Sequence, residues 1–373
     1  MKIITFSVLF VAFLAIAFRY SVDVRYTLSF LATLGYLDFL GGKFLVLASK
    51  CLAECSTYYL KRDFQPNEGR VIKIHEFDCS KGVTMEKFKE ETQNFTIPAV
   101  CRGLLKGSKC TEWSVDYFSQ HTTPEETFRS YQLDPLDSNR RAFMKYEAPT
   151  VFLSANETLS RIKNKEHLYI SFDNTFLTSR HTNLVQDMEL DRFFPGTKFF
   201  LNTLFVSNFR VKTLGSPMHF APNDNFFFQC KGKKHWFYLK PKDLKYVGAY
   251  ISRGVGFSSN FVSEEEILSR LTIFEGIIEE TDVMYNPPFW MHAVGTSTGE
   301  TFSVANRAWR TLLPPPDNYF VDLMYKINFP GFVSSIIWTK FFHNVKKLNS
   351  LTLQGDALSK PDKIDGGLLT IVD

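Results

Sequence analysis

The sequence predicts a mainly β protein, a sandwich or barrel of short strands with flanking helices. Phenylalanine is unusually frequent, with 38 residues in a chain of 373, and aromatic side chains favour the pleated, half-buried surfaces of sheets. Short aromatic or β-branched runs separated by turn residues are the second indication. These runs span residues 199–206, 225–230, 235–239, 283–286 and 301–305.

The composition excludes several other classes of protein. With 45% apolar residues, the chain is neither disordered nor collagen-like, and it has length enough for one large domain or two modest ones. It also lacks the repeated apolar segments of a polytopic membrane protein. The formal net charge of +4 is too small for a nucleic-acid-binding signature, so we expect no nucleic-acid partner.

Residues 1–18 have the pattern of a secretory signal peptide or an uncleaved signal anchor. Met1-Lys2 precedes an apolar run over 3–18, which is shorter than the roughly 20 residues that a membrane span needs. The small-residue pattern at 15–17 is typical of a cleavage site. Either alternative predicts a secretory-pathway protein, lumenal or membrane-anchored with a lumenal domain.

Two further features are compatible with a lumenal address. Asn94-Phe95-Thr96 and Asn156-Glu157-Thr158 are acceptor triplets for N-glycosylation, which makes a glycoprotein possible. The six cysteines are even in number and would pair in an oxidising compartment, although their spacing does not establish a pairing.

The rest of the chain divides into three predicted parts. Residues 19–68 form an amphipathic, membrane-proximal segment and linker: leucines recur every third position from Leu31 to Leu40, which favours a helix lying on a membrane or on the domain. Residues 69–312 form the main domain, within which we expect irregular loops over 124–165. Residues 313–373 form a C-terminal tail with helices at 321–327 and 332–345.

One block of motifs points to a family. His219-Phe220-Ala221 leads into Asn225-Phe226, then into Gln229 and Gly232, and then into Lys234. The runs 282–292 and 302–309 follow, and 113–118 and 168–170 precede. In this order they resemble the JmjC and cupin-like 2-oxoglutarate oxygenases, especially the asparaginyl hydroxylases, over roughly residues 70–309. The resemblance implies a double-stranded β-helix of the jelly-roll type, as in cupins.

The resemblance also implies a ferrous iron site. Such enzymes hold Fe(II) with two histidines and one carboxylate, and a His-x-Asp pair on a strand directs two ligands to the same face. His219 and His292, 73 residues apart, occupy the two histidine positions. Ala221 stands where the family has its carboxylate, so the expected triad is incomplete.

The contacts to the cosubstrate are better preserved by the same comparison. Lys234 matches the family's lysine that pairs with the distal carboxylate of 2-oxoglutarate, and Tyr169 and Ser216 match hydroxyl groups that assist it. Asn225 and Asn306 match amides near the chelating end. These five residues are the expected binding site for the cosubstrate.

Three functions therefore remain open. The first is an Fe(II)/2-oxoglutarate-dependent hydroxylase acting on a protein or peptide side chain. The second is a catalytically inactive pseudoenzyme that serves as a binding or scaffold module. The third is halogenase-like chemistry, because some 2-oxoglutarate halogenases also have a small residue in place of the carboxylate.

Overall fold

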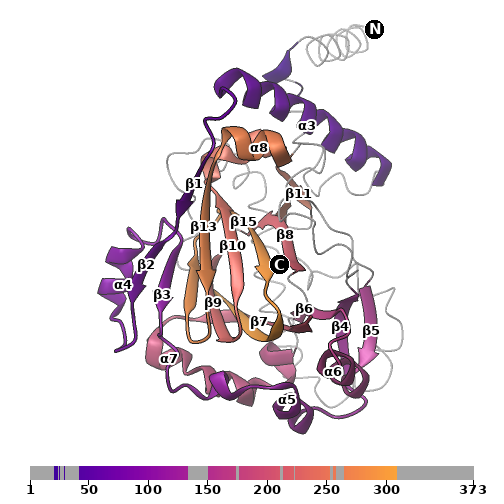
Figure 1. Cartoon of the computed structure of the whole chain (residues 1–373), viewed down its shortest axis with the longest axis vertical. Helices are drawn as coiled ribbons and strands as arrows, with labels where there is room; N and C mark the ends of the chain where they lie inside the picture. The colour runs from indigo at the N-terminus through magenta and orange to yellow at the C-terminus, as the bar shows by residue number, and fades with distance from the viewer. Residues whose placement is uncertain are drawn as a thin grey trace, which may run out of the picture.

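A computed structural model describes residues 21–23, 25, 29, 42–132, 150–173, 176–210, 213–221, 223–252, 255–257 and 264–308. The described chain forms two large, mainly antiparallel β-sheets with helices around them (Figure 1). Buried aromatic and aliphatic side chains from both sheets form a shared core, which includes Trp236 from the first sheet and Phe227 from the second. The predicted mainly β, jelly-roll architecture with flanking helices is confirmed.

The first sheet has seven strands. Their order is β1 (Arg70–Lys73), β13 (Thr272–Ile278), β10 (Lys234–Leu239), β15 (Met291–Thr296), β8 (Thr213–Phe220), β12 (Val255–Phe257) and β11 (Tyr250–Ser252).

The second sheet has nine strands. Their order is β2 (His75–Asp78), β3 (Ala99–Arg102), β14 (Val283–Asn286), β9 (Asp224–Lys231), β16 (Gly299–Ala308), β7 (Phe199–Phe209), β6 (Leu168–Asp173), β4 (Thr127–Gln132) and β5 (Thr150–Ser154).

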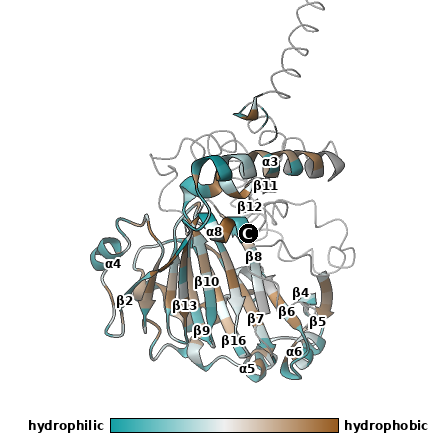
Figure 2. Ribbon diagram, turned by 45° about the horizontal axis from the view of Figure 1, so that its top comes forward, coloured by the Kyte–Doolittle hydropathy of each residue, from teal (hydrophilic) through white to brown (hydrophobic). Residues whose placement is uncertain are grey.

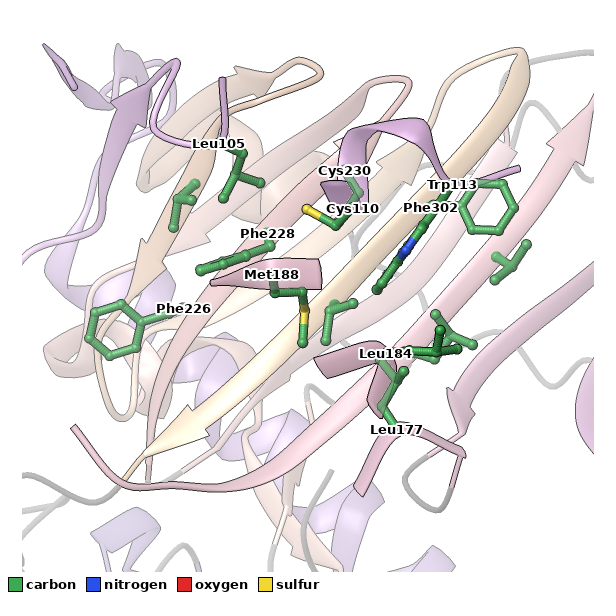
Figure 3. Close-up of a cluster of buried hydrophobic side chains, with 14 of the residues drawn as sticks. Leu105, Cys110, Trp113, Leu177, Leu184, Met188, Phe226, Phe228, Cys230 and Phe302 are labelled. Atoms are coloured by element: carbon green, nitrogen blue, oxygen red, sulfur yellow. The ribbon is translucent and has the colours of Figure 1, made fainter. Parts of the chain in front are cut away.

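Strand β9 shows how the second sheet divides two cores. Successive side chains of a strand point to opposite faces. Phe227 accordingly faces the core between the sheets, whereas Phe226, Phe228 and Cys230 face a second core on the outer side (Figure 3). Both faces are covered, so all but the last residue of β9 is buried, and its central residues 226–228 are three consecutive phenylalanines.

The helical elements lie at the ends and sides of the sheets. They are α3 (Gly42–Asp63), α4 (Met85–Glu91), η2 (Lys109–Glu112), α5 (Val115–His121), α6 (Ala155–Lys163), η4 (Phe176–Arg180), η5 (Thr182–Met188), α7 (Leu190–Phe193), η6 (Pro241–Val247) and α8 (Glu264–Arg270). Thr84 caps the start of helix α4, because its side chain accepts a hydrogen bond from Lys87 N at 3.2 Å.

Helix α3 crosses one end of the sheets next to α8 (Figure 1). Leu52, Cys55 and Leu60 are fully buried, and they pack with residues of η6, α8 and the ends of β8, β10 and β15. Hydrophilic and hydrophobic residues are interspersed along α3 (Figure 2), and Glu54, Lys61 and Arg62 are exposed. α3 therefore packs on the domain through Leu52, Cys55 and Leu60, whereas the leucine repeat on which the predicted amphipathic helix rests lies outside the described residues.

The expectation of irregular loops over 124–165 is wrong where the structure describes this segment. β4, β5 and α6 lie there, with Phe128 and Ser130 buried at alternate positions of β4. Ser154 caps α6 by accepting a hydrogen bond from Glu157 N at 3.2 Å. Ser-x-x-Glu is a known helix-start pattern, so this helix had a signal in the sequence.

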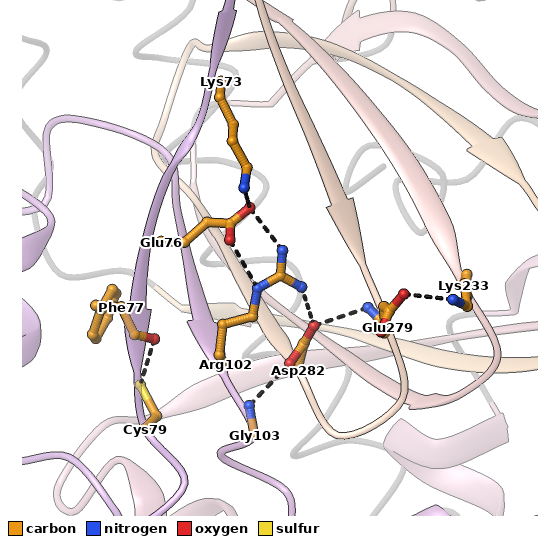
Figure 4. Close-up of polar contacts among 9 residues, drawn as sticks. All are labelled: Lys73, Glu76, Phe77, Cys79, Arg102, Gly103, Lys233, Glu279 and Asp282. Atoms are coloured by element: carbon orange, nitrogen blue, oxygen red, sulfur yellow. Dashed lines mark hydrogen bonds and ion pairs between the residues drawn. The ribbon is translucent and has the colours of Figure 1, made fainter.

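One edge of the molecule joins both sheets. β1 pairs in parallel with β13 in the first sheet, and β2, directly after Ile74, pairs in parallel with β3 in the second. Arg102 on β3 contacts Glu76 and Asp282, and Asp282 also accepts a hydrogen bond from Gly103 N at 2.9 Å (Figure 4).

A disulfide between Cys79 and Cys101 adds a covalent link at this edge. The two cysteines stand beside the paired strands β2 and β3, with α-carbons 5.4 Å apart. The other four cysteines, Cys51, Cys55, Cys110 and Cys230, are free.

Several sequence expectations lie outside the described residues. These are the signal segment 1–18, the leucine repeat at 31–40 and the tail 313–373. Among the helices that the structure describes, none is long and apolar enough to cross a membrane. The domain boundaries at 18, 68 and 312 stay predictions.

Candidate functional site

His219 and His292 lie side by side in the first sheet. β8 and β15 are antiparallel neighbours, and the two histidines are directly paired in their register. Their ring centroids are 4.3 Å apart. Both side chains are buried, and they face the core between the sheets beside Trp236, whose ring centroid is 5.4 Å from that of His292.

Main-chain contacts set the tautomer of both rings. Nδ1 of His219 lies 2.7 Å from the carbonyl oxygen of Pro217, and Nδ1 of His292 lies 2.9 Å from that of Trp290. A carbonyl oxygen only accepts hydrogen bonds, so Nδ1 carries the proton in each ring and Nε2 is the unprotonated nitrogen. In His292, Nδ2 of Asn286 lies 3.4 Å from Nε2 and 3.1 Å from Nδ1. Burial lowers the pKa of His219 to about 4 and that of His292 well below its usual value. Both rings are therefore neutral at pH 7, as metal ligands must be.

Lys234 is a buried cation at the first residue of β10. It is 1% exposed, and Nζ donates to Tyr169 Oη at 3.2 Å and to Thr296 Oγ1 at 3.1 Å. No carboxylate among the described residues lies within 4.0 Å of Nζ. Burial lowers the pKa of Lys234 to about 7. A Cβ at Gly215 would stand 2.7 Å from Thr296 Oγ1, so the absence of a side chain there lets the strands close around these hydroxyl groups.

These groups line one narrow cavity between the sheets, which we call the histidine cavity; its volume of about 10 Å³ has room for roughly one water molecule. Its lining residues are Tyr169, Phe205, Ser216, His219, Asn225, Phe227, Lys234, Trp236, His292, Val294, Ala305 and Arg307. The predicted residues Tyr169, Ser216, Asn225 and Lys234 thus lie together with the two histidines. The side-chain oxygen Oδ1 of Asn225 is buried there without a hydrogen-bond partner.

Asn306 does not lie with them. On β16 it alternates with Ala305 and Arg307, which line the cavity, so its side chain is on the opposite face. Its Nδ2 donates to the main-chain oxygen of Phe226 at 3.1 Å. The expected contact between Asn306 and a cosubstrate is therefore not supported by its position.

Arg307 takes the place at the cavity that Asn306 was expected to have. It is 1% exposed and stands opposite Asn225 in the β9–β16 register. Nη1 donates to Asn223 Oδ1 at 3.1 Å, and the guanidinium charge contributes to lowering the pKa of both His219 and His292. The sequence did not indicate Arg307, because the motif comparison matched Asn306, one position earlier, to the family's amide.

No carboxylate replaces the missing ligand within the described part of the chain. Asp224, the nearest acidic residue in sequence, lies one position before Asn225 and therefore on the other face of β9, where Tyr285 Oη donates to it at 2.5 Å. No group of three or more His, Cys, Asp or Glu residues among the described ones is arranged to hold a metal ion.

The donor set fits the implied cofactors to different degrees. Two neutral imidazoles fit two positions on a ferrous ion, but the described residues supply no third, anionic ligand. The charge of the lining suits a dicarboxylate such as 2-oxoglutarate better, because Lys234 offers a buried ammonium group with no acidic partner among the described residues; the lining side chains must move apart to admit such a ligand.

Comparison with known proteins identifies the family. Residues 85–311 match the family described as "Cupin-like domain", which is more than half of the chain, so the protein belongs to the cupin-like domain family.

Three similar proteins are each named "tRNA wybutosine-synthesizing protein 5". The one from Gallus gallus is 26% identical over 256 residues, covering 62% of this chain and 76% of the relative. Those from Mus musculus and Homo sapiens are 26% and 25% identical, and each comparison covers 62% of this chain and 77% of the relative.

Proposed function

We propose that this protein is a 2-oxoglutarate-binding member of the oxygenase-like cupins, with a hydroxylase-type activity on a protein or peptide side chain. The observation that carries the proposal is the buried Lys234, held by Tyr169 and Thr296 in the same cavity as the paired His219 and His292. A cation buried in this way is costly unless an anion joins it.

The residues of the histidine cavity have separable roles in this proposal. Lys234 binds the distal carboxylate of 2-oxoglutarate, and the Tyr169 and Thr296 hydroxyl groups orient the ammonium group. His219 and His292 would hold Fe(II), which supplies oxygen activation when bound; its third donor would be water or a group beyond the described residues. Trp236, Phe205 and Phe227 exclude bulk water from the cavity.

The substrate class rests on the protein's charge. A net charge of +4 over 373 residues favours a protein or peptide over a polynucleotide. The relatives' name refers to tRNA, so tRNA belongs in the assay as the competing outcome.

The test is succinate formation by the purified protein with Fe(II), 2-oxoglutarate and oxygen. The control is the double variant that carries both His219→Ala and His292→Ala. Succinate that appears with wild type alone supports an oxygenase, and a mass increase of one oxygen in a peptide library locates the substrate. A modified tRNA would overturn the protein-substrate proposal, and a chlorinated product would indicate halogenase-like chemistry. Absence of succinate together with absence of 2-oxoglutarate binding would overturn the proposal as a whole.

A pseudoenzyme is the second candidate. Ala221 brings no carboxylate to the site, and Arg307 brings a positive charge close to both histidines, where a metal ion would also be positive. Both observations favour ligand binding without turnover. This candidate predicts that the protein binds 2-oxoglutarate without forming succinate. It also predicts that a partner still binds the double variant with both His219→Ala and His292→Ala.

We also propose a secretory-pathway location with membrane association through the N-terminal segment. The Cys79–Cys101 disulfide supports an oxidising compartment, and Asn94 is exposed in a turn where a glycan can be carried. Protein from a secretory cell should lose mass on glycosidase treatment, and Asn94→Gln should reduce that loss. A full-length chain that stays reduced and unglycosylated would contradict this location.

A further inference from the structure

We propose that Arg307 is a second anion-binding residue of the histidine cavity, which lets the cavity hold a short dicarboxylate without a metal ion. The inference rests on the proposed binding of a dicarboxylate at Lys234 and goes beyond it. In an iron-dependent site, the metal binds the second carboxylate. Here, a guanidinium group is placed to do so.

The cavity has a cation at each end. Thr296, which contacts Lys234, and His292 are four residues apart on β15, so their α-carbons are separated by about 13 Å. Lys234 therefore marks one end of the cavity and the histidines the other. Arg307 belongs to the histidine end, since its charge acts on both rings and its neighbour across the strands is Asn225.

The charge of the lining favours a dianion. Lys234 and Arg307 both line the cavity, the histidines are neutral, and none of the described lining residues is Asp or Glu. Two buried cations in one low-dielectric space repel each other, and a ligand with an acidic group at each end would offset both charges. Guanidinium groups bind carboxylates in a two-pronged manner, so Arg307 suits this task even though it also donates to Asn223.

The polar groups between the two cations fit the same ligand. Ser216 and Asn225 line the cavity between the two sheets, and their hydroxyl and amide groups are able to donate to carboxylate oxygens. Aromatic walls formed by Phe205, Phe227 and Trp236 suit a short methylene chain. The ligand class is therefore a short linear diacid, for which the lining side chains move apart, and its 2-oxo group is dispensable.

Calorimetry on the full chain in the presence of EDTA tests this proposal with three five-carbon acids. These are 2-oxoglutarate, glutarate (which lacks the 2-oxo group) and pentanoate (which lacks the second carboxylate). We expect 2-oxoglutarate and glutarate to bind within about threefold of each other, and pentanoate to bind at least ~10-fold more weakly, because one charge-assisted contact is lost.

Variants then assign the second contact. Arg307→Met should weaken glutarate binding by ~10-fold or more, and Arg307→Lys by less, because the charge is kept. Arg192→Met, which removes an exposed arginine on α7, is the matched control and should leave binding unchanged. Circular dichroism checks that each variant is folded.

Other outcomes separate this inference from the proposed function. If 2-oxoglutarate binds only after Mn(II) is added and glutarate does not bind, the metal-free anchor is wrong and the proposed function stands. If Arg307→Met binds glutarate as wild type does, Arg307 is not the anchor. If no dicarboxylate binds with or without metal, both proposals fail.

Discussion

At the scale of single residues, the charge of the histidine cavity depends on three positions. Ala221 contributes no carboxylate, while Lys234 and Arg307 contribute cations. Relative to a site with two histidines and an acid, the missing carboxylate at Ala221 and the added charge of Arg307 each shift the local charge towards positive. The same two histidines therefore lie in a pocket that attracts anions more strongly and metal ions more weakly.

Ala221→Asp should restore metal binding. The new carboxylate follows His219 by two positions and supplies the anionic donor that two imidazoles lack. We expect Co(II) affinity, measured by its visible absorption, to rise at least ~10-fold relative to Ala221→Asn, which has the same size without the charge. Equal affinity in the two variants would show that the pocket no longer accommodates a triad.

Lys234 should make stability depend on pH. Burial lowers its pKa to about 7, whereas the unfolded chain has the usual value near 10.5, so between these values the unfolded state binds more protons. The contribution of Lys234 to the free energy of unfolding is therefore least favourable below pH 7 and improves as pH rises towards 10. In urea unfolding, the stability advantage of Lys234→Met over wild type should shrink between pH 6.5 and 9.5. A constant difference would contradict this.

The sequence was informative about these residues where it combined motif order with strand spacing. His219, Ser216, Asn225 and Lys234 occur within 19 consecutive positions, and the structure brings them to one cavity. Asn306 and Arg307 differ by one position, and a shift of one residue changes the face of a strand. Only the register of β16 against β9 decides which of the two lines the cavity.

At the scale of elements, α3 is the clearest case of a helix with two different sides. Leu52 is completely buried against the end of the barrel, whereas Leu47, one and a half turns earlier, is 58% exposed. An apolar periodicity alone predicts such a helix but does not say whether a membrane or a protein surface covers it. The contacts with η6 and α8 answer this question for residues 42–63.

Leu52→Ala and Leu47→Ala form a matched pair for this helix. Leu52→Ala should lower the free energy of unfolding by about 2–4 kcal/mol, because it removes buried methyl groups and leaves a cavity. Leu47→Ala should change it by less than about 0.5 kcal/mol. Thermal or urea unfolding of both variants gives the comparison. Equal losses would mean that α3 is not docked on the barrel through Leu52.

Elements of the core were easier to predict than peripheral ones. The runs at 225–230 and 283–286 are rich in apolar residues and wholly buried, because both faces of their strands are covered. β4 and β5 pair at the edge of the second sheet, and their mixed, partly exposed residues resemble a loop in composition. Their strand character comes from pairing with each other and with β6, which is not visible in local composition.

At the scale of the whole molecule, the fold follows from many weak signals that agree. Short aromatic runs, ordered motifs and a match over residues 85–311 all correspond to one two-sheet domain. The Cys79–Cys101 pair was not predictable, because six cysteines allow many pairings and only the parallel contact of β2 with β3 brings these two together.

Reduction of this disulfide should destabilise the domain. It closes a loop with a sequence separation of 22 residues, for which chain entropy gives about 3 kcal/mol. The melting temperature of wild type should fall in reductant, and Cys79→Ala, Cys101→Ala should show the lower value with or without reductant. Cys51→Ala, a change at a free cysteine on α3, should respond to reductant as wild type does. A melting temperature insensitive to reductant in wild type would refute the link.

Residues 70–78 run along the outer strands of both sheets as a single stretch of chain. Separating the two sheets on that side would break the pairing of β1 with β13 and that of β2 with β3 together. The Cys79–Cys101 disulfide also holds the β2–β3 pair. Among the strands that the structure describes, none continues from one sheet to the other at the far margins, β11 and β5. We therefore expect the local opening that would admit the proposed dicarboxylate to occur at those far margins. Backbone amide hydrogen exchange should accordingly be fastest in β5 and β11 and slowest in β3 and β13.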